Sequence, residues 1–137
     1  MKKESVIFLF FVFAGLSFCC RTVVYAEQDP CSNIVTSQQV FDCSVEKIKN
    51  ADIRLNKAYK NLKGRVSLAY KADPKLGGVY IEKIRNAQRA WLHLRDLTCP
   101  LEAFEIEPGT QAYHSVVNNC FARMEDDRST YLDHLAN

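Results

Sequence analysis

The sequence predicts an all-α fold, an antiparallel three-helix bundle or hairpin with two disulfides at one end. Three observations carry this prediction. Apolar residues recur at steps of three and four in three separate runs, and no strand pattern accompanies them. Four cysteines beyond residue 26 fall where the start of the first helix, the end of the second and the start of the third would meet.

The N-terminus reads as a secretory signal peptide. Two lysines precede an apolar run at residues 6–18, and a short segment ending at Ala26 follows. The run is shorter than the roughly 20 residues that a membrane-spanning helix needs, so we expect cleavage after Ala26 and no stable membrane insertion. Lipoprotein processing at Cys19 or Cys20 is a second route, which the bulky Phe18 disfavours. We therefore expect a periplasmic or secreted protein with one domain at residues 27–137.

The first helix is predicted at residues 37–70, with Thr36 or Ser37 as its N-cap. Residues 71–74 end it, because the residue before a proline is pushed out of the helical region. Gly77 and Gly78 then complete a turn or a more mobile loop. The apolar stripe of this helix is Ile48, Leu55, Tyr59, Leu62, Val66 and Ala69.

The second helix follows a cleaner stripe and is expected to stop at Pro100. A loop at residues 101–113 follows it, and a third apolar stripe between residues 117 and 135 indicates the third helix. The second stripe comprises Tyr80, Ile84, Ala87, Trp91, Leu94 and Thr98; the third comprises Val117, Cys120, Phe121, Met124, Tyr131, Leu132 and Leu135.

Cys31, Cys43, Cys99 and Cys120 form an even set in a short exported chain, which indicates two disulfides. Sequence leaves all three connectivities open. We favour 31–43 with 99–120, since each bridge closes a weakly held segment. A zinc site is disfavoured because the cysteines lack Cys-x-x-Cys spacing and the histidines are scattered, so we expect no metal and no cofactor.

Charge is distributed unevenly along the predicted domain. Residues 27–95 carry 13 Lys/Arg against 7 Asp/Glu, whereas residues 96–137 carry 2 against 8. This asymmetry favours attraction between the faces of a bundle, with a patch for a charged protein partner as the alternative. Export and the absence of an aromatic-basic motif argue against nucleic acid as a partner.

Two charged side chains fall at a similar height in the bundle. Asp52 lies nine residues beyond Cys43, and Arg128 lies eight residues beyond Cys120. We expect an interior Asp52–Arg128 pair supported by Gln88 or Asn56. The alternative is two solvated charges on separate helices.

Residues 101–107, which we call the acidic segment, are the candidate binding surface. The segment mixes apolar residues with carboxylates and lies between two cysteines, and its candidate contact residues are Glu102, Phe104, Glu105 and Glu107. It suits the cleft of a basic, sugar-cleaving enzyme, because opposite charge steers encounter and preorganisation lowers the cost of binding. A solvated connector, with Phe104 or Ile106 capping the bundle, is the alternative.

The sequence gives little sign of an enzyme. His93, His114 and His134 lie in different segments, with no metalloprotease, nucleophile-elbow or phosphate-loop pattern around them. Consecutive carboxylates such as Glu125 and Asp126 point in different directions on a helix. We therefore expect no catalytic residues.

The stretches ADIRLNKAYKNL at residues 51–62 and AQRAWLHLRDLTC at residues 87–99 resemble the LprI-like lysozyme-inhibitor family. The resemblance spans about residues 31–135. Its most specific residues are Asp52, Leu55, Asn56, Tyr59, Gln88, Trp91, Arg95, Asp96 and Cys99. Helix three departs from the family pattern, which usually has threonine where Glu125 stands, and the loop after Cys99 lacks the family's glycine richness.

The resemblance implies a small exported helical domain whose motif is mainly structural. It also implies a protein partner, such as a lysozyme or another cell-wall hydrolase. A general envelope scaffold, or an immunity-type partner of a secreted toxin, stays open as a rival. On its apolar stripe Trp91 is expected in the core, with Arg95 against its ring or paired with an acid.

Overall fold

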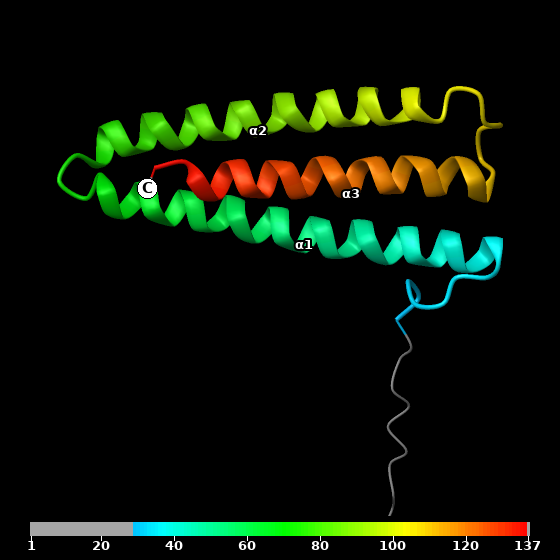
Figure 1. The fold of residues 1–137 in the computed structure, drawn as a ribbon. Helices are drawn as coiled ribbons and strands as arrows, with labels where there is room; N and C mark the ends of the chain where they lie inside the picture. Colours follow the sequence, from blue (N-terminus) through cyan, green and yellow to red (C-terminus); the bar gives the residue numbers. More distant parts are fainter. Residues whose placement is uncertain (1–28, 137) are drawn as a thin grey trace, which may run out of the picture.

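The computed structural model describes residues 29–136, which form three antiparallel α-helices (Figure 1). Helix α1 spans Ser37–Ala69, α2 spans Pro74–Glu102 and α3 spans Gln111–His134. In Figure 1, α3 lies between the other two helices and packs far more extensively on α1 than on α2. The all-α fold with three helices is therefore confirmed; the expected signal peptide lies outside the described residues.

Helix α1 begins at a capping box. The Thr36 hydroxyl accepts a hydrogen bond from the Gln39 amide, and the Gln39 side chain accepts one from the Thr36 amide in return. Of the two caps predicted, Thr36 is thus the one used. The buried stripe of α1 is Ala51, Leu55, Ala58, Leu62 and Val66. Two alanines stand in this stripe, which lets neighbouring helices approach closely.

Helix α2 begins earlier than the sequence pattern predicts. Asp73 caps it by accepting a hydrogen bond from the Leu76 amide at 3.0 Å, and Pro74 occupies the first turn, where its missing N–H is tolerated. The predicted turn at Gly77 and Gly78 is therefore wrong, since both glycines are helical. Gly77 is buried against Tyr70, and a Cβ there would stand only 2.8 Å from the Tyr70 Cβ, so the close approach of α1 and α2 at this point requires glycine.

The predicted stop at Pro100 is also wrong, because α2 continues to Glu102. Pro100 has no backbone N–H to donate to the preceding turn, but its own carbonyl still accepts a hydrogen bond: the Ala103 amide donates to it at 3.2 Å. Helix α3 begins at Gln111 with Thr110 as its N-cap, inside the loop predicted at residues 101–113. The connection between α2 and α3 is correspondingly short.

Two buried clusters hold the helices together. The first joins all three helices near the α1–α2 turn. The second lies between the C-terminal end of α2 and the first half of α3. The first contains Leu55, Ala58, Leu62, Val66, Ile84 and Leu132; the second contains Cys99, Ala103, Val117 and Cys120. No helix in the described part of the chain has the length and apolar character needed to cross a bilayer.

Helix α2 presents a different face to the bundle from the one predicted. Ala87 and Leu94 are exposed, Leu94 to 57%, although the apolar stripe places both inside. The inward face instead carries Ile84, Gln88, Trp91, Arg95 and Cys99, of which Trp91 and Arg95 are partly buried. Because two of these residues are polar, hydrophobic periodicity alone placed the stripe incorrectly.

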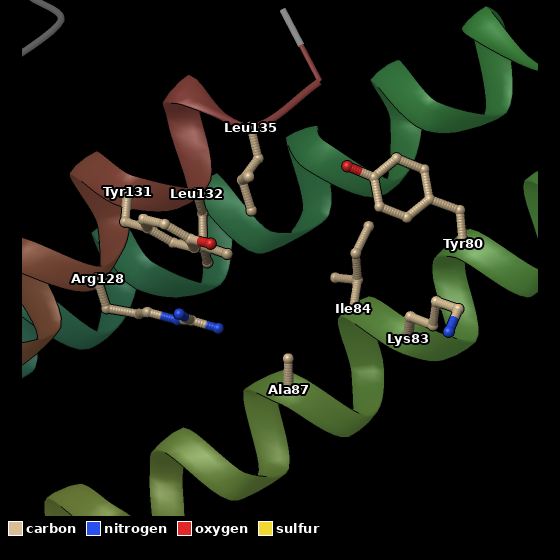
Figure 2. Close-up of a pocket in the computed structure, with 8 residues that line it drawn as sticks. All are labelled: Tyr80, Lys83, Ile84, Ala87, Arg128, Tyr131, Leu132 and Leu135. Atoms are coloured by element: carbon tan, nitrogen blue, oxygen red, sulfur yellow. The ribbon is translucent and has the colours of Figure 1, made fainter.

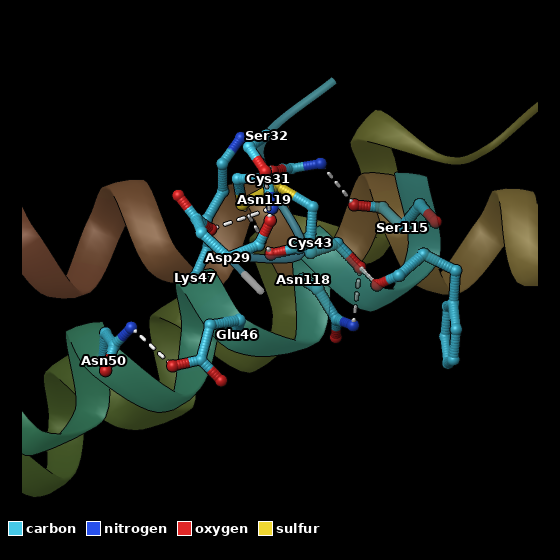
Figure 3. The surroundings of a disulfide bond; sticks show 12 residues. Asp29, Cys31, Ser32, Cys43, Glu46, Lys47, Asn50, Ser115, Asn118 and Asn119 are labelled. Atoms are coloured by element: carbon cyan, nitrogen blue, oxygen red, sulfur yellow. Dashed lines mark hydrogen bonds between the residues drawn. A yellow bond between two sulfur atoms is a disulfide. The ribbon is translucent and has the colours of Figure 1, made fainter. Parts of the chain in front are cut away.

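The disulfides are Cys31–Cys43 and Cys99–Cys120, which confirms the favoured pairing. Figure 3 shows the first bridge, which ties the segment before α1 to the second turn of that helix. Nearby, the Asn118 side chain of α3 donates to the Ser44 hydroxyl of α1 at 3.2 Å. Both bridges lie in the half of the bundle where α1 and α3 begin and α2 ends.

Candidate functional site

A polar layer joins α2 to α3. Arg95 is only 16% exposed in its side chain and donates to the carboxylates of Glu125 and, at 2.6 Å, Asp96. Its guanidinium carbon stands 4.7 Å from the Phe121 ring centroid and 5.8 Å from that of Trp91. Both expected positions of Arg95, against the Trp91 ring and paired with an acid, thus occur together.

Glu125 is the most deeply buried charged group of this layer, with 1% of its surface exposed. Its Oε1 accepts from Arg95, and its Oε2 is buried without a hydrogen-bond partner. Burial raises the pKa of Glu125, the Arg95 charge opposes that shift, and the Asp52 charge adds to it.

The predicted Asp52–Arg128 pair is wrong. Asp52 is exposed and accepts a hydrogen bond from Asn56 at 2.9 Å, whereas the Arg128 Nε donates to the Gln88 Oε1 at 3.0 Å. Asn56 and Gln88, the two residues predicted to support the pair, therefore bind Asp52 and Arg128 separately. Tyr59, further along α1, packs against the first cluster with Lys63 over its ring.

Arg128 is positioned by rings as well as by Gln88. Its guanidinium carbon lies 5.6 Å from the Trp91 ring centroid and 4.9 Å from that of Tyr131. Among residues 29–136, no carboxylate forms an ion pair with it. Burial lowers the pKa of Arg128, and the Tyr131 charge offsets part of that shift.

Beside Arg128 lies a cavity of about 220 Å³ between α2 and α3, which we call the Arg128 groove. Figure 2 shows the guanidinium extending from α3 into the space between the helices, with apolar side chains from both helices around it. The lining residues are Tyr80, Lys83, Ile84, Ala87, Arg128, Tyr131, Leu132 and Leu135. The groove thus combines an apolar wall with a cation.

The acidic segment lies at the opposite end of α2. Ala103 is fully buried and Ile106 packs against the cluster around the Cys99–Cys120 bridge. Phe104 is 84% exposed and Leu101 69% exposed. Ile106 therefore closes the end of the bundle, and Phe104 projects into solvent.

The carboxylates of the acidic segment differ in their surroundings. Glu102 belongs to the last turn of α2 and forms an ion pair with Arg123 of α3. Glu105 and Glu107 are exposed and form no ion pair within the described part of the chain. Of the three glutamates, these two are the more accessible to a partner.

Basic residues from the first part of the chain form ion pairs with acidic residues of α3. Arg54 of α1 donates from Nε to Asp126 of α3 at 2.7 Å, and Arg95 of α2 meets Glu125 of α3. His93 is exposed. Within residues 29–136 no three His, Cys, Asp or Glu side chains gather as a metal site would require.

Sequence reasoning missed the burial of Glu125 and the groove. A signal for Glu125 existed, because it follows Phe121 by four residues and precedes Arg128 by three, on the inward face of α3. The groove had no such signal. Its shape depends on how α2 packs against α3, and side chains on both helices determine that packing.

The chain is similar to a known family and to individual known proteins. The profile of the family described as lysozyme inhibitor LprI matches residues 29–132. An uncharacterized protein of Rhizobium meliloti (strain 1021) is 30% identical over 129 residues, covering 88% of this chain and 90% of that protein.

A solved structure shares the fold. It is a crystal structure of a DUF1311 family protein from Pseudomonas putida KT2440, 31% identical, with a TM-score of 0.67. The match covers 74% of this chain and 95% of that one. With a family match over residues 29–132 and relatives at this identity, the chain belongs to the LprI lysozyme inhibitor family.

Proposed function

We propose that this protein binds and inhibits a lysozyme-type cell-wall hydrolase, using the acidic segment as its contact surface. Family membership supports a binding role rather than catalysis, and together with the two disulfides it supports an extracytoplasmic location. The observation that carries the proposal is the position of Phe104. It is 84% exposed on a segment whose neighbours are fixed in the bundle.

The segment is preorganised for binding. The Cys99–Cys120 bridge closes the loop that contains it, Ala103 is fully buried within it, and Ile106 packs on the cluster around that bridge. A partner that covers Phe104 therefore gains apolar burial without ordering a mobile loop. Full burial of a phenylalanine side chain contributes about 1.5–3 kcal/mol, roughly ten- to hundredfold in affinity.

Charge supports the same class of partner. Glu105 and Glu107 follow Phe104 in the chain, are exposed, and form no ion pair among the described residues. An enzyme that is basic around its substrate cleft would be attracted to this end of the molecule, and opposite charge raises the association rate. Glu102 contributes less directly, since Arg123 already neutralises it.

The test is the rate at which a basic lysozyme clears a peptidoglycan suspension in the presence of the purified, oxidised protein. Phe104→Ser is expected to raise the inhibition constant about ten- to hundredfold. Its matched control is Leu68→Ser, which removes an exposed apolar side chain near the C-terminal end of α1. The control is expected to inhibit as the wild type does.

A second pair of variants tests charge. Reversing Glu105 and Glu107 to lysine is expected to slow association most at low salt, whereas reversing Glu82 and Asp127 gives the same net charge away from the segment and leaves association nearly unchanged. Equal effects of the two reversals would contradict the proposed surface. No inhibition at micromolar protein would overturn the function for the lysozymes tested. Affinity capture from a periplasmic extract would then address the scaffold and immunity-type alternatives.

A further inference from the structure

In the Arg128 groove, an amide and two aromatic rings position the guanidinium, and no carboxylate among residues 29–136 forms an ion pair with it. Nε of Arg128 is fixed by the Gln88 amide oxygen, and the Trp91 and Tyr131 rings lie near the guanidinium. Gln88 is itself buried, which keeps this support in one position. The arginine is therefore held in place before any ligand arrives.

The remaining donors of Arg128 suit a carboxylate. Nε donates to Gln88, and the edge formed by the two Nη atoms bonds to no other residue within the described range 29–136 and extends into the groove in Figure 2. A guanidinium edge matches the two oxygens of a carboxylate in a bidentate arrangement. Partial burial strengthens such a contact, because less water competes for the donors.

The rest of the groove favours an apolar body on that carboxylate. Ile84, Ala87, Leu132 and Leu135 supply apolar surface on both sides, and Lys83 adds a second positive charge at the rim. About 220 Å³ accommodates a group of the size of one or two amino-acid side chains. A larger ligand would have to extend out of the groove.

We propose that the Arg128 groove is a binding site for a monocarboxylate carried on a short branched apolar group, with the carboxylate on the Nη edge of Arg128 and the apolar group between Ile84 and Leu135. This site is separate from the acidic segment. It takes a small anionic ligand, whereas the acidic segment contacts a basic protein surface.

The chain offers a direct readout, because Trp91 is its single tryptophan and lies 5.6 Å from the Arg128 guanidinium carbon. Titration of the whole protein with 4-methylpentanoate is expected to give a saturable change in Trp91 fluorescence. The matched amide, 4-methylpentanamide, has the same shape without the charge and is expected to bind at least about tenfold more weakly. Equal binding of acid and amide would overturn the site.

Two variants separate binding from folding. Ala87→Leu fills the groove without altering Arg128, and is expected to weaken 4-methylpentanoate binding at least about tenfold, while Ala90→Leu on the exposed side of α2 leaves it unchanged. Arg128→Gln is expected to abolish the preference for acid over amide, with circular dichroism confirming that it is helical. Unchanged binding by Ala87→Leu, or no saturable response in the folded wild type, would refute the proposal.

A peptide arm identifies the source of the carboxylate. Acetyl-Ala-Leu with a free C-terminus presents the same branched group on a peptide. Tighter binding than 4-methylpentanoate supports a peptide C-terminus as the ligand, and equal binding supports a free acid. Because lysozyme is absent from these titrations, their outcome is independent of the inhibitory function proposed above.

Discussion

Replacing Arg95 with methionine tests how the α2–α3 interface is held. The change keeps an unbranched apolar side chain near Trp91 and Phe121 but removes the positive charge from Glu125, which is 1% exposed. Removing one partner of a buried pair destabilises a protein by about 3–5 kcal/mol, because the other charge stays buried. We expect a loss of this size at pH 7.

The loss should depend on pH in a defined direction. Burial already holds the pKa of Glu125 above its ordinary value of 4.5, so the folded state binds this proton more tightly than the unfolded state. The Glu125 contribution is then most favourable below pH 4.5 and is lost as the pH rises through the folded pKa. Without Arg95 the folded pKa rises further, because the charge that opposes the effect of burial is removed.

Urea unfolding of the wild type and of Arg95→Met between pH 4 and pH 8 measures this. The penalty is expected to shrink towards pH 4, where Glu125 is protonated in both states, and adding Glu125→Gln to the variant should remove most of its pH dependence. The control is Arg54→Met, whose ion pair with Asp126 is about half exposed and whose loss should be about 1 kcal/mol or less. A penalty for Arg95→Met no larger than the control, or one that does not change with pH, would refute the reasoning.

Two further predictions concern the stability of the helix bundle. Gly77→Ala should destabilise the protein, because its Cβ would stand 2.8 Å from the Tyr70 Cβ. Gly78→Ala meets nothing within 4 Å and should stabilise α2 by up to about 1 kcal/mol. Thermal unfolding of the two variants tests this order of stability. Replacing Cys99 and Cys120 with serine should lower the free energy of unfolding by about 3 kcal/mol in urea, and a loss near zero would contradict a stabilising role for the bridge.

The sequence predicted α1 well because its inward face is apolar. Leu55, Leu62 and Val66 recur at helical spacing, and all three are buried. For α2 the same method failed, since Gln88 and Arg95 face the bundle while Leu94 faces solvent. Hydrophobic periodicity cannot identify an inward face on which polar side chains are held by rings and ion pairs.

The failed Asp52–Arg128 pair has a separate cause. Counting residues from the cysteines placed both side chains at a similar height along the bundle, but height does not determine which side of its helix a residue occupies. Asp52 follows the buried Ala51 and is exposed, whereas Arg128 faces α2. The favoured disulfide pairing is correct because it depended on a local property, namely that each bridge closes a weakly held segment, and not on the orientation of side chains around a helix.

The two proposed binding surfaces are far enough apart to be varied independently. Lys83 in the groove and Leu101 in the acidic segment are eighteen residues apart on α2, about 27 Å at 1.5 Å per residue. Substitutions separated by more than roughly 10 Å usually have additive effects. Arg95 lies between them, so Arg95→Met is the change most able to affect both, through the position of α2 on α3. If Arg95→Met alters lysozyme inhibition and carboxylate binding together while Phe104→Ser and Ala87→Leu each alter only one, the polar layer is what holds both surfaces in position.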